Sequence, residues 1–155
     1  MAASSTDLVE VSQRNFCLGG MRFITLTGQI GDWKLDIRQY SQSEEGMHIP
    51  TEDGIQLSLE QWENLKYFEE SVSENLCKIL RDPERNCLFI GYLGNRVSIA
   101  VKSELKAVDI RLWYQSEDGS MKRSSTGILL TQSQWDRLLI VRAELDHYLP
   151  YDPEW

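Results

Sequence analysis

The side chains best suited to catalysis or metal binding in this sequence are two histidines, two acidic pairs and three cysteines. Neither His48 nor His147 has a nucleophile pattern beside it, and the acidic pairs at 44–45 and 52–53 fall in polar turn segments. The cysteines lack the CxxC or Cys/His spacing of metal ligands, and no phosphate-cradling glycine motif is present. We therefore expect no enzyme, no cofactor and no metal site.

Composition is that of a folded, soluble chain. Of 155 residues, 41% are hydrophobic and 26% charged, and no stretch approaches the roughly 20 apolar residues of a membrane span. The start Met-Ala-Ala-Ser-Ser-Thr-Asp lacks a basic and apolar leader, and the odd cysteine count fits reduced thiols. These features predict a nuclear or cytoplasmic protein that is not secreted and has no membrane partner.

The net charge of −8 argues against indiscriminate nucleic-acid binding, because Lys and Arg supply most of the affinity for phosphate. Any nucleic-acid site must therefore be a local concentration of basic residues.

An internal repeat organises the chain. A shift of 73 residues aligns Asp36-Ile-Arg38 with Asp109-Ile-Arg111, Gly54-Ile55 with Gly127-Ile128, and Gln61-Trp62 with Gln134-Trp135. Upstream, Ile24-Thr-Leu26 matches Val97-Ser-Ile99 at the same shift, and Leu18-Gly19 matches Ile90-Gly91 at 72, which implies one inserted residue. The chain is thus two copies of one module.

Each copy is predicted to be strands followed by a helix. Residues 22–27 and 32–40 have strand character, and Leu35 and Ile37 alternate with Asp36 and Arg38. Ser58-Leu-Glu-Gln61 and Thr131-Gln-Ser-Gln134 have the form of a capping box at the start of a helix. Apolar residues then follow at spacings of 3, 7 and 4 and predict a buried stripe: Trp62, Leu65, Val72 and Leu76, and Trp135, Leu138, Leu145 and Leu149.

We expect a flexible tail over 1–14, a first module over 15–81, a short polar break containing Pro83, a second module over 87–150 and a tail over 151–155. The break is too short to let the modules move independently.

The ordered set Phe16-Cys-Leu-Gly-Gly-Met-Arg-Phe-Ile-Thr-Leu26, Leu35-Asp-Ile-Arg-Gln-Tyr40, Pro50, Gly54-Ile-Gln-Leu57 and Glu60-Gln-Trp62 resembles the positive cofactor four family of transcriptional coactivators. The second copy repeats it with Asp109-Ile-Arg111, Met121-Lys122, Gly127-Ile128 and Gln134-Trp135. The resemblance implies an α+β fold of two tandem four-strand-plus-C-terminal-helix modules that form an intramolecular pseudo-dimer. It also implies binding of single-stranded DNA, contact with transcription machinery proteins, and a monomer with internal pseudo-twofold symmetry, while single-stranded RNA stays open as an alternative ligand.

Single-strand binders combine cations with aromatic faces on which bases stack, and the two copies differ in both. Residues 22–57 hold 3 basic and 6 acidic residues, whereas 95–130 hold 6 basic and 4 acidic. The acidic segment Ile49-Pro-Thr-Glu-Asp53 stands where the second copy keeps Lys122-Arg123, and Ser41 stands where it has Tyr114. We therefore expect the second module to dominate nucleic-acid contact, through the residues Arg38, Lys102, Lys106, Arg111, Trp113, Tyr114, Lys122 and Arg123.

Two alternatives stay open at this stage. Arg38 and Arg111 also suit a solvated strand face or an ion pair with a neighbouring Asp, and a tryptophan such as Trp113 suits either core or platform. The whole chain also suits a protein-interaction scaffold that has lost nucleic-acid binding, whose acidic surface serves a basic partner.

One charged pair interrupts the helix stripes. The 73-residue shift places Glu69 at the position of Arg142, so pairing of like modules would oppose two glutamates or two arginines, whereas the mixed pair is complementary. We expect these residues to form an ion pair that specifies pairing within the chain. The alternative is that both are exposed and unrelated.

Overall fold

The computed structural model describes residues 12–29, 32–82, 84, 86, 88–147 and 149. They form eight strands and the helices that follow each group of four strands: β1 (Ser12–Gly19), β2 (Arg22–Gln29), β3 (Asp32–Gln42), β4 (His48–Ser58), α2 (Leu59–Leu65), the 3₁₀ turn η1 (Lys66–Phe68), α3 (Glu69–Arg81), β5 (Leu88–Gly94), β6 (Val97–Lys102), β7 (Ala107–Gln115), β8 (Met121–Leu130) and α4 (Gln132–Leu145). The α+β fold and the two modules are confirmed.

The expected tails fall largely outside the described residues. Residues 12–14, assigned above to the N-terminal tail, already belong to β1. The structure does not describe the rest of the N-terminal tail or the C-terminal tail at 151–155. Positions 83, 85, 87, 148 and 150, near the expected module boundaries, also lie outside the described residues.

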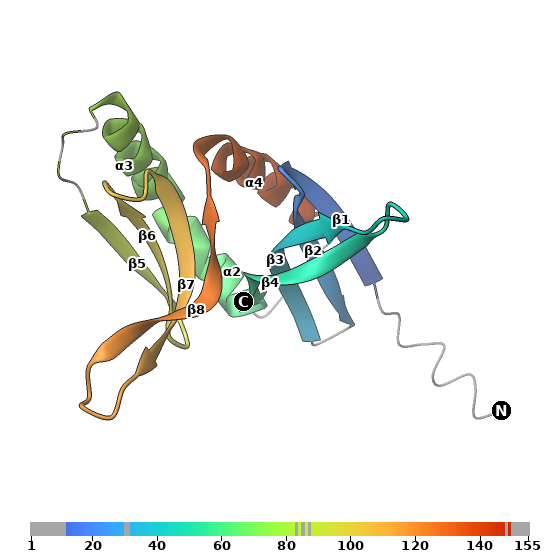
Figure 1. The fold of residues 1–155 in the computed structure, drawn as a ribbon, viewed down its shortest axis with the longest axis horizontal. Helices are drawn as coiled ribbons and strands as arrows, with labels where there is room; N and C mark the ends of the chain where they lie inside the picture. The colour runs from blue at the N-terminus through green and yellow to red at the C-terminus, as the bar shows by residue number, and fades with distance from the viewer. Residues whose placement is uncertain are drawn as a thin grey trace.

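The eight strands form one antiparallel sheet in the order β1-β2-β3-β4-β8-β7-β6-β5. The two halves are joined by one residue pair, Gly54 opposite Gly127. Figure 1 shows the halves diverging from this junction, with the helices gathered on one side of the strands. Because so few backbone hydrogen bonds cross the junction, the helices must supply most of the connection between the modules.

Each helix reaches across to the other module. Helix α3 packs against β5, β6 and β7, and α4 lies beside β1. The capping-box glutamines mark the crossing: Gln61 Nε2 donates to Gly94 O at 2.8 Å, and Gln134 Nε2 donates to Gly19 O at 3.1 Å. The two modules therefore exchange helix contacts, and neither half of the sheet is covered by its own helix alone.

Both helices begin where the sequence predicts. The hydroxyls of Ser58 and Thr131 accept hydrogen bonds from the backbone of Gln61 and Gln134, and both glutamine side chains return a bond to the capping residue's backbone. The first helix is interrupted by η1, whereas α4 runs without a break for 14 residues. All eight residues of the predicted stripes are buried, although Leu149 lies beyond the end of α4.

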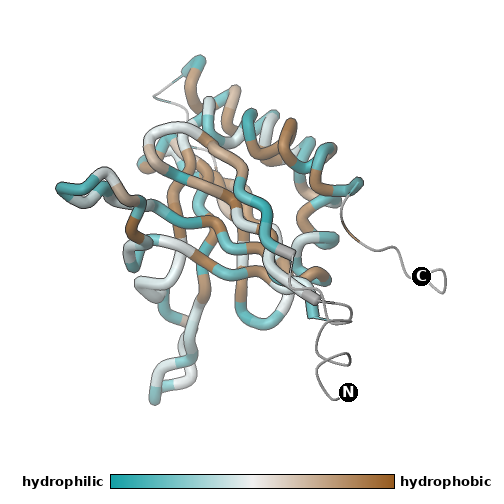
Figure 2. The backbone as a smooth tube through the Cα atoms, turned by 90° about the vertical axis from the view of Figure 1, so that its right-hand side faces the viewer, coloured by the Kyte–Doolittle hydropathy of each residue, from teal (hydrophilic) through white to brown (hydrophobic). Residues whose placement is uncertain are grey.

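The core is one continuous cluster between the sheet and the helices. Trp62 and Trp135 are fully buried in it, and the hydrophobic segments in Figure 2 lie mainly along the strands and the helices that cover them, whereas the hairpin ends are polar. Burying large aromatic side chains supplies much of the stabilisation of a small domain.

The register of the repeat differs from the sequence-based one at the start of each module. Ile24 lies opposite Ile37, and Ile99 lies opposite Ile110, so Ile24 corresponds to Ile99 at a shift of 75 rather than 73. The predicted match of Ile24 with Val97 is therefore wrong. The change comes from the connection between β2 and β3. Thr27 pairs with Lys34 there, and the equivalent pair in the second module is Lys102 with Ala107. The connection between β2 and β3 is therefore two residues longer than the one between β6 and β7.

Candidate nucleic-acid interface

The face of the sheet opposite the helices carries most of the predicted binding residues. Successive strand residues point to opposite faces, and in β7 Val108 and Ile110 belong to the core shared with the helices. Asp109, Arg111 and Trp113 therefore lie on the other face, which we call the helix-free face. Asp36, Arg38 and Tyr40 occupy the same face on β3.

Arg38 and Arg111, which occupy equivalent positions in the two copies, are both held in ion pairs. Arg38 donates from Nε and Nη2 to the carboxylate of Asp36 at 3.0 Å each, and Arg111 Nε donates to Asp109 Oδ1 at 3.0 Å. The hydrogen bonds that Arg38 donates to Asp36 raise the pKa of Arg38 further above its ordinary value, although burial acts in the opposite direction. The ion-pair alternative therefore describes the geometry of both arginines, and each has little net charge left for phosphate.

A backbone carbonyl fixes the far end of each guanidinium. Arg38 Nη1 donates to Thr51 O at 2.8 Å, and Arg111 Nη1 donates to Ser124 O at 3.0 Å. Both acceptors lie where β4 and β8 shift register against their partner strands. The two modules thus build the same arginine cradle.

Glycine is required beneath each guanidinium. A Cβ at Gly54 would lie 2.8 Å from Arg38 Cζ, and one at Gly127 would lie 2.8 Å from Arg111 Cζ and 2.7 Å from Ile110 O. Since these glycines are also the single pair that joins β4 to β8, the cradles meet at the centre of the sheet.

The second module adds a cluster of cations and an aromatic ring to this face. Arg123 lies opposite Trp113 on β8 and donates from Nη2 to Asp109 Oδ2 at 3.1 Å. Lys102 Nζ lies 5.8 Å from the centre of the Trp113 ring, in cation–π geometry. Because one buried carboxylate, Asp109, faces two arginines while Lys102 adds a third cation, the cluster stays positive.

Three predicted residues do not join this cluster. Tyr114 and Lys122 pair across β7 and β8, next in sequence to Trp113 and Arg123, so alternation directs them to the opposite face of the hairpin. Lys106 is exposed in the turn between β6 and β7. The structure therefore brings together Lys102, Arg111, Trp113 and Arg123, and leaves Lys106, Tyr114 and Lys122 at its edges.

The tip of the β7–β8 hairpin forms a shallow, open surface lined by Ser116, Glu117, Asp118 and Lys122. Hydrogen bonds from Ser116 and Ser120 lower the pKa of the Asp118 carboxyl to about 2. This carboxylate is therefore ionised beside Lys122 at any physiological pH and reduces the charge that Lys122 presents.

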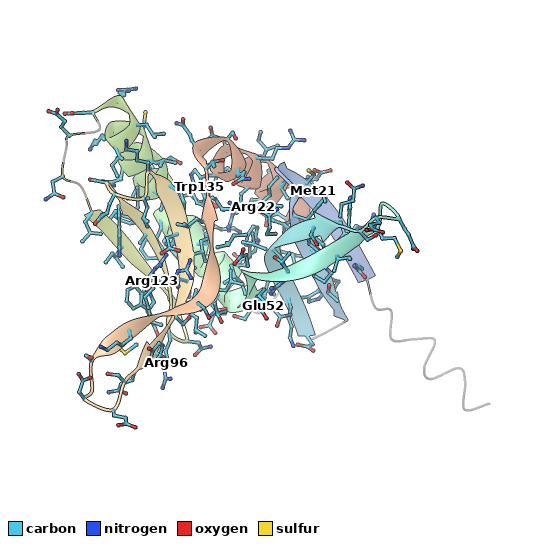
Figure 3. The ribbon with its side chains drawn as sticks, viewed as in Figure 1. Met21, Arg22, Glu52, Arg96, Arg123 and Trp135 are labelled. Carbon is cyan, nitrogen blue, oxygen red and sulfur yellow. The ribbon has the colours of Figure 1, made fainter. Side chains whose placement is uncertain are left out.

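The first module presents a different surface on the same face. Phe23 packs edge-on against Tyr40 at 5.3 Å and lies 5.3 Å from His48. Beyond this aromatic group, Glu52 and Asp53 are exposed on β4; Figure 3 places Glu52 near the centre of the molecule and Arg123 on the other half. With Arg38 neutralised by Asp36, this half has an acidic margin.

The charge count above includes Arg22 among the cations of the first module, but its side chain lies at the contact between the modules. It donates to Gln134 Oε1 at 2.9 Å and also to the carbonyl of Leu129, and Figure 3 shows it between the two halves. Burial lowers its pKa, and Asp53 acts in the opposite direction.

Glu69 and Arg142 are in contact across the helices. The distance from Arg142 Nε to Glu69 Oε1 is 2.6 Å, and the side chains are 4% and 27% exposed for Arg142 and Glu69. Arg142 also donates to Trp62 O at 3.1 Å and stacks 4.8 Å from the Trp62 ring centre. Burial raises the pKa of Glu69, and the fields of Arg142 and Lys66 only partly oppose it.

Comparison with protein families gives a match to the model described as Transcriptional Coactivator p15 (PC4), over residues 16–67 and again over 96–141. The two matches cover more than half of the chain, and each falls within one of the two structural modules. The chain belongs to the PC4 family. Its two copies are tandem PC4 modules, and PC4 is a family of DNA-binding coactivators.

The described residues contain no helix long and apolar enough to cross a membrane. They also contain no group of three or more His, Cys, Asp or Glu side chains placed to hold a metal ion.

Proposed function

We propose that this chain binds single-stranded nucleic acid on the helix-free face of its sheet, and that the second module supplies most of the contact. The observation that carries the proposal is the cluster of Lys102, Arg111, Trp113 and Arg123, in which Lys102 lies over the Trp113 ring and Arg123 lies opposite Trp113 on the neighbouring strand. Single-strand binders use this combination, since cations bind the phosphates and ring faces stack with bases.

The first module contributes less because two of the three cations in residues 22–57 are committed. Arg38 is paired with Asp36 and Arg22 is used between the modules, while Glu52 and Asp53 repel phosphate at the margin. A chain with net charge −8 can therefore bind nucleic acid only through a local surface, and its affinity should fall steeply with salt.

Membership of the PC4 family supports a role as a nuclear coactivator that contacts transcription machinery proteins. Within that role, the chain acts as a monomer, because the second module occupies the place that a partner subunit would fill. The acidic margin of the first module is the feature that favours the competing function, a protein-interaction scaffold for a basic partner.

The test is fluorescence anisotropy of the full chain with labelled single-stranded DNA, single-stranded RNA and duplex DNA over a salt series. We expect the single strand to bind more tightly than the duplex. Lys102→Ala should reduce the salt slope by about 0.7, the value for one single-strand phosphate contact, whereas Lys78→Ala on the exposed side of α3 should leave it unchanged. Absence of single-strand binding at low salt would refute the proposal and favour the scaffold.

A further inference from the structure

Edge strand β5 carries an exposed apolar row. Leu88, Ile90 and Tyr92 alternate with Phe89, Gly91 and Leu93, and they are 61%, 53% and 61% exposed. The alternate set faces the helices: Leu93 is fully buried, and Phe89 packs 6.1 Å from Phe68. The exposed row therefore lies on the helix-free face.

The row is not a requirement of the module fold. With the 75-residue register of the outer strands, the positions of Leu88, Ile90 and Tyr92 are occupied in the first module by Gln13, Asn15 and Cys17. The first module folds with polar or small side chains there. Exposing three large apolar side chains in one row is unfavourable in water, so their presence in the second module alone marks a candidate contact surface.

The neighbours of the row are cationic. Leu88 lies opposite Lys102 on β6, and Tyr92 lies opposite Ser98, which in turn lies opposite Arg111. The row is thus continuous with the cluster of the proposed interface, and no acidic residue separates Leu88 from Lys102. A ligand that complements both surfaces would carry negative charge together with apolar groups.

The turn that follows β5 fixes the Tyr92 ring. The backbone N–H of Arg96 donates to Tyr92 Oη at 3.1 Å, while the carbonyl of Arg96 accepts from Trp113 N at 2.8 Å. One residue of the turn therefore links Tyr92 of β5 to Trp113 of β7. A ring held in place loses less freedom on binding than a mobile one.

We infer that Leu88, Ile90 and Tyr92 form a platform for unpaired bases, which extends the nucleic-acid site from the cationic cluster to the outer edge of the second module. The inference rests on the proposed function and adds the surface that reads bases rather than phosphates. A peptide strand added to the free edge of β5 is the competing occupant.

The test compares two proteins, the parent and a variant, on two ligands, a natural and an abasic strand. The double variant Ile90→Ser/Tyr92→Ser and the parent are titrated with a labelled single-stranded oligonucleotide and with an abasic strand of the same length and charge. We expect the variant to bind the natural strand about tenfold more weakly, as loss of one stacked base predicts, with an unchanged salt slope. Its affinity for the abasic strand should equal that of the parent.

Two controls isolate the platform. Ile140→Ser changes an apolar side chain of α4 that is 64% exposed, and should bind both strands as the parent does. Tyr92→Trp should retain affinity because the ring is what stacks. Circular dichroism melting of each variant verifies folding.

Equal affinity of parent and double variant for the natural strand would overturn the inference while leaving the proposed function intact, and so would an equal loss on both strands. If the parent binds neither strand, the proposed function and the inference fall together.

Discussion

Reversing the charge of Glu69 tests how the two modules recognise each other. Glu69→Arg would place a second cation against Arg142, which is 4% exposed and has its Nε 2.6 Å from the Glu69 carboxylate. Removing one member of a buried pair costs about 3 to 5 kcal/mol, because the other charge is left unpaired. Since Glu69 retains 27% of its exposure, we expect about 3 kcal/mol, or a fall in Tm of roughly 6 to 12 °C for a chain of this length.

Arg142→Glu should cost a similar amount by opposing two carboxylates. The double variant Glu69→Arg/Arg142→Glu restores an opposite pair, and pseudo-symmetry offers the new arginine the Trp135 ring in place of Trp62. Two like-charge contacts remain, with Lys66 three residues before position 69 and Asp146 four residues after 142. At about 0.2 to 0.5 kcal/mol each, they leave the double variant within about 1 kcal/mol of the parent.

The raised pKa of Glu69 gives the pair a second signature. A carboxyl whose folded pKa lies above its unfolded value contributes stability that is present below the unfolded pKa, 4.5, and is lost as pH rises through the folded pKa. At neutral pH the attraction to Arg142 and Lys66 thus does not fully offset the cost of burying the Glu69 charge. An ion pair of this kind specifies an arrangement more than it stabilises it. Glu69→Gln should remove this pH dependence.

Thermal and urea unfolding of the parent, both single variants and the double variant measure the coupling directly. Glu63→Arg is the matched control, since Glu63 forms a more exposed pair with Lys66 at 2.9 Å and should cost less than about 1 kcal/mol. An equimolar mixture of the two single variants should also form a mixed dimer, because opposite charges are then available only between chains. Additive single effects, or melting of all variants with the parent, would refute the reasoning.

Three further outcomes follow from the described contacts. Light scattering of the parent at micromolar concentration should give the 18.0 kDa mass of one chain; a stable dimer would contradict the proposed monomer. Gly127→Ala should destabilise the fold by about 1 to 3 kcal/mol in urea unfolding, because the added carbon would lie 2.7 Å from Ile110 O; unchanged stability would show that the junction tolerates a side chain. By NMR, the Asp118 carboxyl should titrate near pH 2 and move toward its ordinary value in Ser116→Ala; a parent midpoint near 3.8 would rule out the Ser116 and Ser120 bonds in solution.

Local sequence rules predicted the helix starts and the stripes. A capping box depends on four consecutive residues, so Ser58 to Gln61 and Thr131 to Gln134 carry the information without tertiary help. The Asp-Ile-Arg spacing likewise places Asp and Arg on one strand face, and their ion pair was one of the alternatives it left open.

The register error has a physical cause. Strand patterns repeat every two residues, so the alternating runs around Ile24 and Val97 match almost as well when one is moved by two positions. Only the cross-strand partners, Ile37 and Ile110, fix the alignment. The same period of two shows why Trp113 and Tyr114, or Lys122 and Arg123, cannot share a face, a constraint already available from the sequence.

Long-range features were not readable from the sequence. The exchange of helices, the single Gly54–Gly127 junction and the sharing of Asp109 between Arg111 and Arg123 each depend on residues far apart in the chain. The exposed row on β5 was hidden by the wrong register, because its polar counterparts in the first module are found only with the 75-residue alignment.

The most direct test of the central claim, that the second module dominates nucleic-acid contact, is a charge reversal in each module followed by anisotropy with labelled single-stranded DNA across a salt series. Lys102→Glu/Arg123→Glu should remove most of the affinity and flatten the salt slope, whereas Glu52→Lys/Asp53→Lys should strengthen binding by converting repulsion into phosphate contacts. Equal small effects from the two double variants, or a larger loss from altering the first module, would contradict the account.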